Sequence, residues 1–199
     1  MKRAIFLFDT SGTMAKPWAD AGVECHLLDL QNENGFDPDN PMIRRWKWDA
    51  FNDPIPKLHN LIFVAAWPPC TDLARSGGRW FAGKGLRALS KAIELFAIAA
   101  EYCDDSGAPY LIENPVSTIS SYWRKPDHVF HPCHYNAFFS GDSYTKKTCL
   151  WTGGGFKMPP PHMEPDLPID TTWIHHQPPG KERANIRSAT PPGFAYATW

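Results

Sequence analysis

The chain has 199 residues, 43% of them hydrophobic, which predicts one domain over residues 1–199 with a single sizeable core and little left for a second domain. We expect neither a membrane-spanning segment nor a secretory signal, and five widely spaced cysteines favour reduced thiols, so the expected location is cytoplasmic. A formal charge of −1 excludes a general attraction to nucleic acid, so any DNA contact must come from local patches.

The first predicted element is a buried strand, the apolar run AIFLF at residues 4–8. The sequence DTSGT follows it, and its small residues are typical of a strand-to-helix turn where backbone amides approach a ligand. Gly12 is the expected position of close approach. An ordinary strand-to-helix connection has the same pattern, so that alternative stays open.

The second predicted strand lies in HLLDL and ends at Asp29. In doubly wound sheets a carboxylate about twenty residues after the first turn holds ribose hydroxyls. This spacing favours a nucleoside-bearing cofactor. Further on, in WKWDAF, Asp49 is a candidate acceptor for an adenine amino group with Trp48 packing beside it, although a loop aspartate and a core tryptophan explain the pattern equally well.

The next apolar run, LIFVAAW, stops at Pro68, Pro69 and Cys70. Two prolines at the end of a buried strand hold the following side chain on a stiff loop at the sheet edge, which predicts that Cys70 is a nucleophile. The alternative is a small buried hydrophobe, the usual role of a lone cysteine.

Residues 71–85 mix glycines with Arg75 and Arg79 and predict a mobile loop, either solvated or closing over a substrate with its arginines on phosphates. A helix over residues 85–103 follows, with apolar residues at three- and four-residue steps. It leads to the strand-like run PYLIEN, where Glu113 comes at the end. A strand–helix–strand unit is right-handed and parallel, so Cys70 and Glu113 should share one edge of a Rossmann-like, mostly parallel α/β sheet with flanking helices.

The remaining residues, 116–199, are less regular. A basic-aromatic cluster around Arg124 suits stacking and phosphate contact, and it suits a packed surface equally well. The histidines and cysteine of residues 128–134 match no standard zinc spacing, so we predict no metal site.

These motifs resemble the DNA cytosine-C5 methyltransferase family, and in particular its short phage-type members. The resemblance rests on the glycine turn in IFLFDTSGT, the acidic end of HLLDL, the PPC and ENP sequences, and the C-terminal RSATPPGFA. It covers nearly the whole chain.

The resemblance implies a Rossmann-like, S-adenosylmethionine-dependent methyltransferase fold, with residues 1–115 as the cofactor and catalytic core. It implies methyl transfer to C5 of cytosine in DNA through a covalent bond between Cys70 and C6, with Glu113 acting at N3. The implied S-adenosylmethionine site consists of Phe8, Asp9, Ser11, Gly12, Thr13, Asp29, Leu30, Asp49 and Pro68. The implied substrate site consists of Pro69, Arg75, Arg79, Asn114, Arg124 and Lys147.

The sequence departs from the family in two places. Where larger members carry Gln-x-Arg-x-Arg, this chain has Thr145, Lys147 and Cys149, so Lys147, Arg124 or a C-terminal element would have to replace the second arginine. Beyond Trp151 a proline-rich stretch is too short for a target-recognition domain, so sequence specificity should be low or supplied by a protein partner. The C-terminal segment is expected to return to the first strand and complete the cofactor pocket.

Two other functions stay open. One is a related pyrimidine-modifying enzyme that acts on a nucleotide or on RNA, which the missing recognition domain permits. The other is a catalytically inactive homologue that binds nucleic acid or cofactor, which the Thr145–Cys149 departure and the reduced glycine turn permit.

Overall fold

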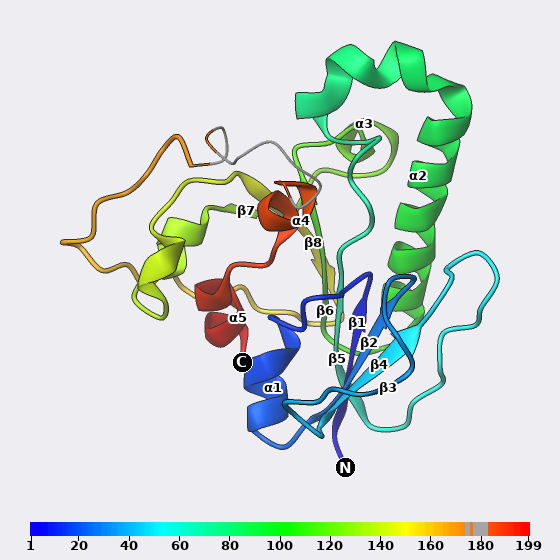
Figure 1. The fold of residues 1–199 in the computed structure, drawn as a ribbon, viewed down its shortest axis with the longest axis vertical. Helices are drawn as coiled ribbons and strands as arrows, with labels where there is room; N and C mark the ends of the chain where they lie inside the picture. The colour runs from blue at the N-terminus through cyan, green and yellow to red at the C-terminus, as the bar shows by residue number, and fades with distance from the viewer. Residues whose placement is uncertain (174–175, 177–182) are drawn as a thin grey trace.

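The computed structural model describes residues 1–173, 176 and 183–199, and within them the chain forms an α/β fold around one eight-stranded sheet (Figure 1). The strands are β1 (Arg3–Leu7), β2 (Glu24–Asp29), β3 (Gly35–Phe36), β4 (Ile43–Lys47), β5 (Leu61–Ala66), β6 (Tyr110–Pro115), β7 (His128–Phe130) and β8 (Thr148–Gly153). The α-helices are α1 (Ala15–Asp20), α2 (Phe81–Asp105), α3 (Ile119–Tyr122), α4 (Arg183–Ser188) and α5 (Pro192–Thr198). The 3₁₀ helices are η1 (Arg75–Trp80), η2 (Pro132–Tyr135) and η3 (Ser140–Asp142). Among these described helices, none combines the length and the apolar character needed to cross a membrane.

The strand order is β3-β4-β2-β1-β5-β6-β8-β7. The five central strands β4, β2, β1, β5 and β6 pair in parallel, whereas β3 and β8 run antiparallel to their neighbours. The predicted α/β fold with a mostly parallel sheet is therefore confirmed. Because parallel strands end at the same edge, the loops after these five strands meet there, the usual location of a ligand site in such sheets.

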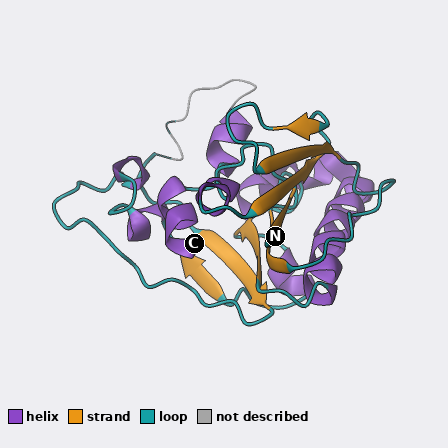
Figure 2. Cartoon of the chain, turned by 90° about the horizontal axis from the view of Figure 1, so that it is seen from below, coloured by secondary structure: helices purple, strands orange, loops and turns teal. Residues whose placement is uncertain are grey.

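Both faces of the central strands are buried, which explains their continuous apolar sequences. In β1, Ala4 and Phe6 belong to a core packed against α1, while Ile5 and Leu7 belong to a core packed against α2. Helices α1 and α5 lie on one side of the sheet and α2 on the other (Figure 1, Figure 2).

The first core is built from aromatic stacking. The ring of Trp18 in α1 stacks on Phe63 of β5 at 4.4 Å between centroids, and Phe194 of α5 stacks on Phe130 of β7 at 4.2 Å. Helix α5 packs against α1, η2 and η3, and Phe194 shares this core with Ala4 and Phe6 of β1, the strand to which the C-terminal segment was expected to return.

The prediction of a loop over residues 71–85 is wrong. The segment forms η1 and the first turn of α2, and α2 bends at Gly85, whose φ is +78°. The loop prediction relied on four glycines, but only Gly85 adopts the left-handed backbone that glycine alone favours. The others occupy helical conformations, which glycine tolerates at a cost of about 1 kcal/mol each. The predicted crossover helix itself is confirmed, as the part of α2 that follows the bend at Gly85.

Candidate active site

The carboxyl ends of five parallel strands bring most of the predicted site residues to one edge of the sheet. Phe8 follows β1, Asp29 ends β2, and Asp49 comes two residues after β4. The PPC sequence follows β5, and Glu113 and Asn114 lie in the last half of β6. The topology therefore joins segments that are far apart in the sequence.

The PPC and ENP segments are hydrogen-bonded to each other. The buried side chain of Asn114 donates from Nδ2 to the carbonyl of Pro68 at 2.9 Å. Beyond them the two chains continue side by side, with Arg75 N–H donating to the carbonyl of Val116 at 2.9 Å and Thr118 N–H donating to that of Leu73 at 3.0 Å. These bonds hold Cys70 beside the end of β6.

Cys70 itself begins a tight turn, because its carbonyl accepts from the amides of Leu73 and Ala74 at 3.0 and 2.8 Å. Pro68 is buried and Pro69 is exposed, whereas the thiol is only partly accessible. A partly accessible thiol on a rigid turn fits the predicted role of a nucleophile.

The charge of the Glu113 carboxyl affects the pKa of the Cys70 thiol. Burial raises the pKa of the Glu113 carboxyl, and the charge of Lys146 opposes that rise. The Oε1 atom of Glu113 is buried and has no hydrogen-bond partner among the described residues. Burial also raises the pKa of the Cys70 thiol, as does the charge of Glu113, whereas Lys146 and Arg187 lower it. A neutral Glu113 therefore favours the thiolate, so the pair suits an acid beside a nucleophile.

Two cations of this site, Lys146 and Arg187, were not predicted. Lys147 was the expected residue, but its side chain is exposed, while Lys146 is 6% exposed and donates from Nζ to the carbonyl of Ala189 at 3.2 Å. Both lysines precede β8, which begins at Thr148, and Lys146 rather than Lys147 acts on the pKa of Glu113. The sequence pattern does not distinguish these two adjacent lysines.

The three predicted substrate-binding arginines lie on η1 and after α3. Arg75 and Arg79 are exposed on η1, and the Arg79 guanidinium lies 5.0 Å from the ring centroid of Trp80. Arg124 forms an ion pair with Asp127 at 2.5 Å and donates to the carbonyl of Thr152 at 3.2 Å. Thr152 pairs with Leu111, near the start of β6, so the contacts of Arg124 lie toward the opposite end of that strand from Asn114.

The glycine turn differs from its expected form. The Asp9 carboxylate accepts from Ser11 N–H, Ser11 Oγ and Gly12 N–H through Oδ1, at 2.7, 2.9 and 2.9 Å. The Gly12 amide is therefore used within the chain instead of facing a ligand. Glycine is required for a different reason: φ is +69° and a Cβ would lie 3.2 Å from Leu27. Thr13 N–H donates to Ser11 Oγ at 3.1 Å, which completes the turn.

One carboxylate oxygen of this turn makes no hydrogen bond to the described residues. It is the buried Oδ2 atom of Asp9, and burial raises the pKa of this carboxyl. Phe8 has a left-handed φ of +59° and its ring meets Trp48 edge-on at 5.2 Å. Strained backbone of this kind concentrates at functional sites.

The end of β2 offers the features of a nucleoside site. Asp29 accepts from Gln31 N–H at 2.8 Å, and burial raises the pKa of its partly buried carboxyl. The neighbouring Leu30 side chain is 60% exposed, so an apolar surface lies beside a carboxylate at the sheet edge. The Asp49 carboxylate, by contrast, is exposed and accepts from Phe51 N–H and Asn52 Nδ2, which lowers its pKa.

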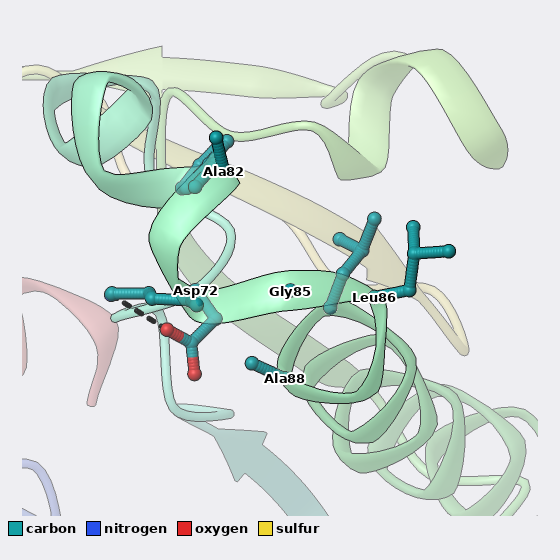
Figure 3. Close-up of a pocket in the computed structure, with 8 residues that line it drawn as sticks. Asp72, Ala82, Gly85, Leu86 and Ala88 are labelled. Carbon is teal, nitrogen blue, oxygen red and sulfur yellow. Dashed lines mark hydrogen bonds and ion pairs between the residues drawn. The ribbon is translucent and has the colours of Figure 1, made fainter.

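A cavity of about 390 Å³ lies at the bend of α2, immediately after the Cys70 turn (Figure 3). The ion pair of Asp72 with Lys84, at 2.6 Å, lies on its wall, and Lys84 also donates to the carbonyl of Thr71. Leu86, at the bend, is 83% exposed. A second cavity of about 600 Å³ lies beside β4 and is lined partly by Trp46 and Trp48.

The described residues contain no group of three or more His, Cys, Asp or Glu placed to hold a metal ion. His134 instead lies in η2 and His131 caps its start, where the amide of His131 donates to Nδ1 of His134 at 3.5 Å. No protein-family model matches this chain, and no curated protein sequence matches it.

Proposed function

We propose that this protein transfers a methyl group from S-adenosylmethionine to C5 of cytosine in DNA through a covalent intermediate on Cys70. The observation that supports this most directly is the joining of the two loops: the Cys70 turn is hydrogen-bonded to the segment that carries Glu113, whose Oε1 atom is buried. A nucleophile next to a carboxyl with a raised pKa is what addition to a pyrimidine ring requires.

The reaction begins at the pyrimidine ring. C5 of cytosine is too weak a nucleophile, so the Cys70 thiolate first forms a bond to C6. The C5=C6 electron pair then moves to C4–C5, and the C4=N3 pair moves to N3, which takes the proton of Glu113. Burial raises the pKa of Glu113, which favours the protonated carboxyl that this step uses.

The remaining steps restore the ring. S-adenosylmethionine, when bound, supplies the methyl group and keeps the electron pair of the broken sulfur–carbon bond. C5 takes the methyl group, and the N3 proton returns to Glu113. A base then removes the C5 proton, the C5=C6 bond re-forms and the thiolate leaves.

The residues at the ends of β1 and β2 fit this cofactor. Asp29 would accept from ribose hydroxyls, and the exposed Leu30 would pack against the adenine. The partnerless Oδ2 of Asp9 would accept from the methionine ammonium group.

A nucleotide or RNA substrate is the second candidate, supported by the segment after β8. Residues 154–173 contain no helix and no strand among the described residues, apart from an isolated bridge at Asp170. Residues 174–175 and 177–182 of the proline-rich stretch lie outside the described residues. With no recognition domain in the described segment, sequence specificity on DNA would come from a protein partner.

The test is formation of a covalent adduct. Labelled S-adenosylmethionine is incubated with duplex DNA, single-stranded DNA, RNA or free nucleotides, each also prepared with 5-fluorocytosine. Fluorine at C5 cannot leave as a proton, so the methylated base should stay bonded to Cys70. Cys70→Ser should abolish the adduct in intact-protein mass spectrometry, while Cys133→Ser, which alters a buried thiol in η2, should retain it.

The kind of nucleic acid or nucleotide that forms the adduct identifies the class of substrate. Label on an exocyclic amine would contradict the proposal, since methylation there needs no thiol addition. An adduct mapped to Cys103, Cys133 or Cys149 would show that another cysteine is the nucleophile. Absence of any adduct with wild type would favour an inactive binding protein.

A further inference from the structure

The sheet edge formed by β3 and β4 carries aromatic and cationic side chains on one face. Phe36 of β3 pairs with Arg44 of β4, so both side chains lie on the same face, and Trp46 follows two residues later on that face. The Arg44 guanidinium lies 5.8 Å from the ring centroid of Phe36 and 4.2 Å from that of Trp46. Phe36 is 67% exposed, and Arg44 is exposed as well. The edge therefore presents two rings that share one cation.

A chain of hydrogen bonds along the sheet fixes the ring of Trp46. Its Nε1 donates to Nδ1 of His26 on β2 at 3.1 Å, so the neutral imidazole carries its proton on Nε2. That Nε2 lies 3.0 Å from Oε1 of Glu24, whose other carboxylate oxygen accepts from Arg3 at 2.9 Å. The indole N–H is thus satisfied within the protein, and the rest of the ring offers an apolar surface held in one orientation.

The same edge has an excess of positive charge. Neither Arg44 nor Lys47 takes part in an ion pair within the part of the chain that the structure describes, and both are exposed. Arg45, which lies between them, is paired with Asp37 at 2.7 Å. Asp53 lies on the wall of the neighbouring cavity, where its carboxylate accepts from a backbone amide. This local excess occurs in a chain whose formal charge is −1, so it forms the kind of patch that attracts an anionic polymer.

The cavity of about 600 Å³ continues this surface. It is bounded by β4 and by the loop that carries Pro54 and Pro56, and Arg44 and Trp46 are among its lining residues. In the strand order, β2 and β1 separate β4 from β5, the strand that leads to Cys70. The surface is therefore distinct from the site of Cys70 and Glu113.

We propose that this edge binds single-stranded nucleic acid, with bases stacked on Phe36 and Trp46 and with the backbone phosphates held by Arg44 and Lys47. Every base has a flat face that stacks on an aromatic ring, and cations along the surface neutralise the backbone. The bases of a duplex are already stacked on each other and do not reach the rings. A mononucleotide would contact one ring, whereas a strand contacts both rings and both cations. This site goes beyond the proposed reaction and does not depend on it.

The experiment measures the anisotropy of a fluorescent oligothymidylate, which contains no cytosine and so is not a substrate of the proposed reaction. A duplex of the same length, thymidine monophosphate and inorganic polyphosphate are compared as competitors. The single strand should bind, and each competitor should be needed at far higher concentration, because none of them offers unpaired bases and phosphates together along a chain. Cys70→Ser should bind the strand as wild type does.

Variants separate stacking from charge. Phe36→Ser should weaken binding of the strand about 5–100-fold, the range for one stacked base, whereas Phe36→Tyr keeps a ring and should bind like wild type. Arg44→Gln and Lys47→Gln should each make the slope of log affinity against log salt concentration less steep by about 0.7, the value for one phosphate of a single strand.

Two control variants alter exposed residues on other elements. Tyr122→Ser changes a ring on α3 that is 65% exposed, and Arg87→Gln changes an exposed arginine on α2. Both should bind the strand like wild type. Phe36→Ser should leave the affinity for S-adenosylmethionine unchanged in calorimetry, which separates this surface from the proposed cofactor site.

Photochemical crosslinking of wild type tests the site without any variant. A single strand that carries 5-iododeoxyuridine should crosslink to Phe36 or Trp46 when the adduct is mapped by mass spectrometry. Crosslinks confined to α3, or a loss of affinity in Tyr122→Ser and not in Phe36→Ser, would place the strand elsewhere and overturn the proposal. Equal affinity for the duplex or for polyphosphate would show that charge alone is recognised, and equal affinity for thymidine monophosphate would make the ligand a free nucleotide. Each of these results overturns the single-strand site and leaves the adduct test of Cys70 unaffected.

Discussion

At the scale of single residues, the electrostatics of Cys70 and Glu113 depend on which of two adjacent lysines is buried. Lys146 is buried and lowers the pKa of both Cys70 and Glu113. Lys147 is exposed, and its charge acts on His131 and Cys149 instead. The two side chains have the same chemistry, so the structure provides a matched pair of variants.

We predict that Lys146→Gln shifts the pH dependence of Cys70 alkylation to higher pH. A positive charge favours the thiolate, so its removal raises the thiol pKa further. Glu113→Gln should shift the profile to lower pH, because it removes a negative charge that raises the same pKa. Lys147→Gln should leave the profile unchanged. The measurement is the iodoacetamide rate at Cys70 by mass spectrometry, and equal shifts in both lysine variants would contradict the assignment.

At the scale of elements, the antiparallel β8 depends on the turn that follows it. Gly154 has a φ of +59°, and a Cβ there would lie 1.9 Å from the carbonyl of Ala108. Gly155 also has a positive φ, +83°, but has open space around it. The chain therefore leaves β8 against the loop before β6, and only one of the two glycines is confined by packing.

We predict that Gly154→Ala destabilises the fold far more than Gly155→Ala. The second substitution carries only the cost of a left-handed residue, about 1–2 kcal/mol, whereas the first adds a backbone clash that costs a further 1–3 kcal/mol or more. Urea denaturation at constant m-value measures both. Equal midpoints for the two variants would show that the turn relaxes without cost.

At the scale of the whole molecule, the C-terminal segment joins the two halves of the chain. Trp199 meets Trp18 of α1 edge-on at 5.0 Å, and Phe194 packs on Phe130 and Tyr135. The buried carboxylate of Asp142 accepts from the Gly193 amide within this packing. Burial raises the pKa of Asp142 to about 6.

We predict that Asp142→Asn changes the pH dependence of stability. A carboxyl whose pKa is raised in the folded state binds more protons there than in the unfolded chain, so wild-type stability falls as pH rises between its ordinary pKa and about 6. The full effect of such a shift is about 3 kcal/mol at neutral pH. Asparagine keeps an acceptor for Gly193 and removes the buried charge, so this slope should disappear.

The measurement is the free energy of unfolding from pH 4 to 8, with Asp166→Asn as a control at an exposed carboxylate. If the free energy of unfolding depends on pH in the same way in wild type and Asp142→Asn, the buried Asp142 carboxyl does not cause the slope. A slope that also disappears in Asp166→Asn would assign it to general surface charge.

The sequence by itself determined the α/β class, the crossover helix and the shared edge of Cys70 and Glu113. Each of these follows from local information: continuous apolar runs form strands buried on both faces, periodic apolar residues form the helix, and the handedness of the connection places both strand ends together. The glycines of residues 71–85 misled the prediction because glycine permits a loop without requiring one.

Only the tertiary structure decided which cations join the thiol and the acid. Lys146 is buried and acts on the pKa of both Cys70 and Glu113, whereas Lys147, the next residue in the chain, is exposed. Arg187 acts on the pKa of Cys70 from a chain end that is anchored at Lys146 and Asp142. Contacts between segments so distant in the chain depend on the packing of the whole fold, and no local pattern around Arg187 contains them.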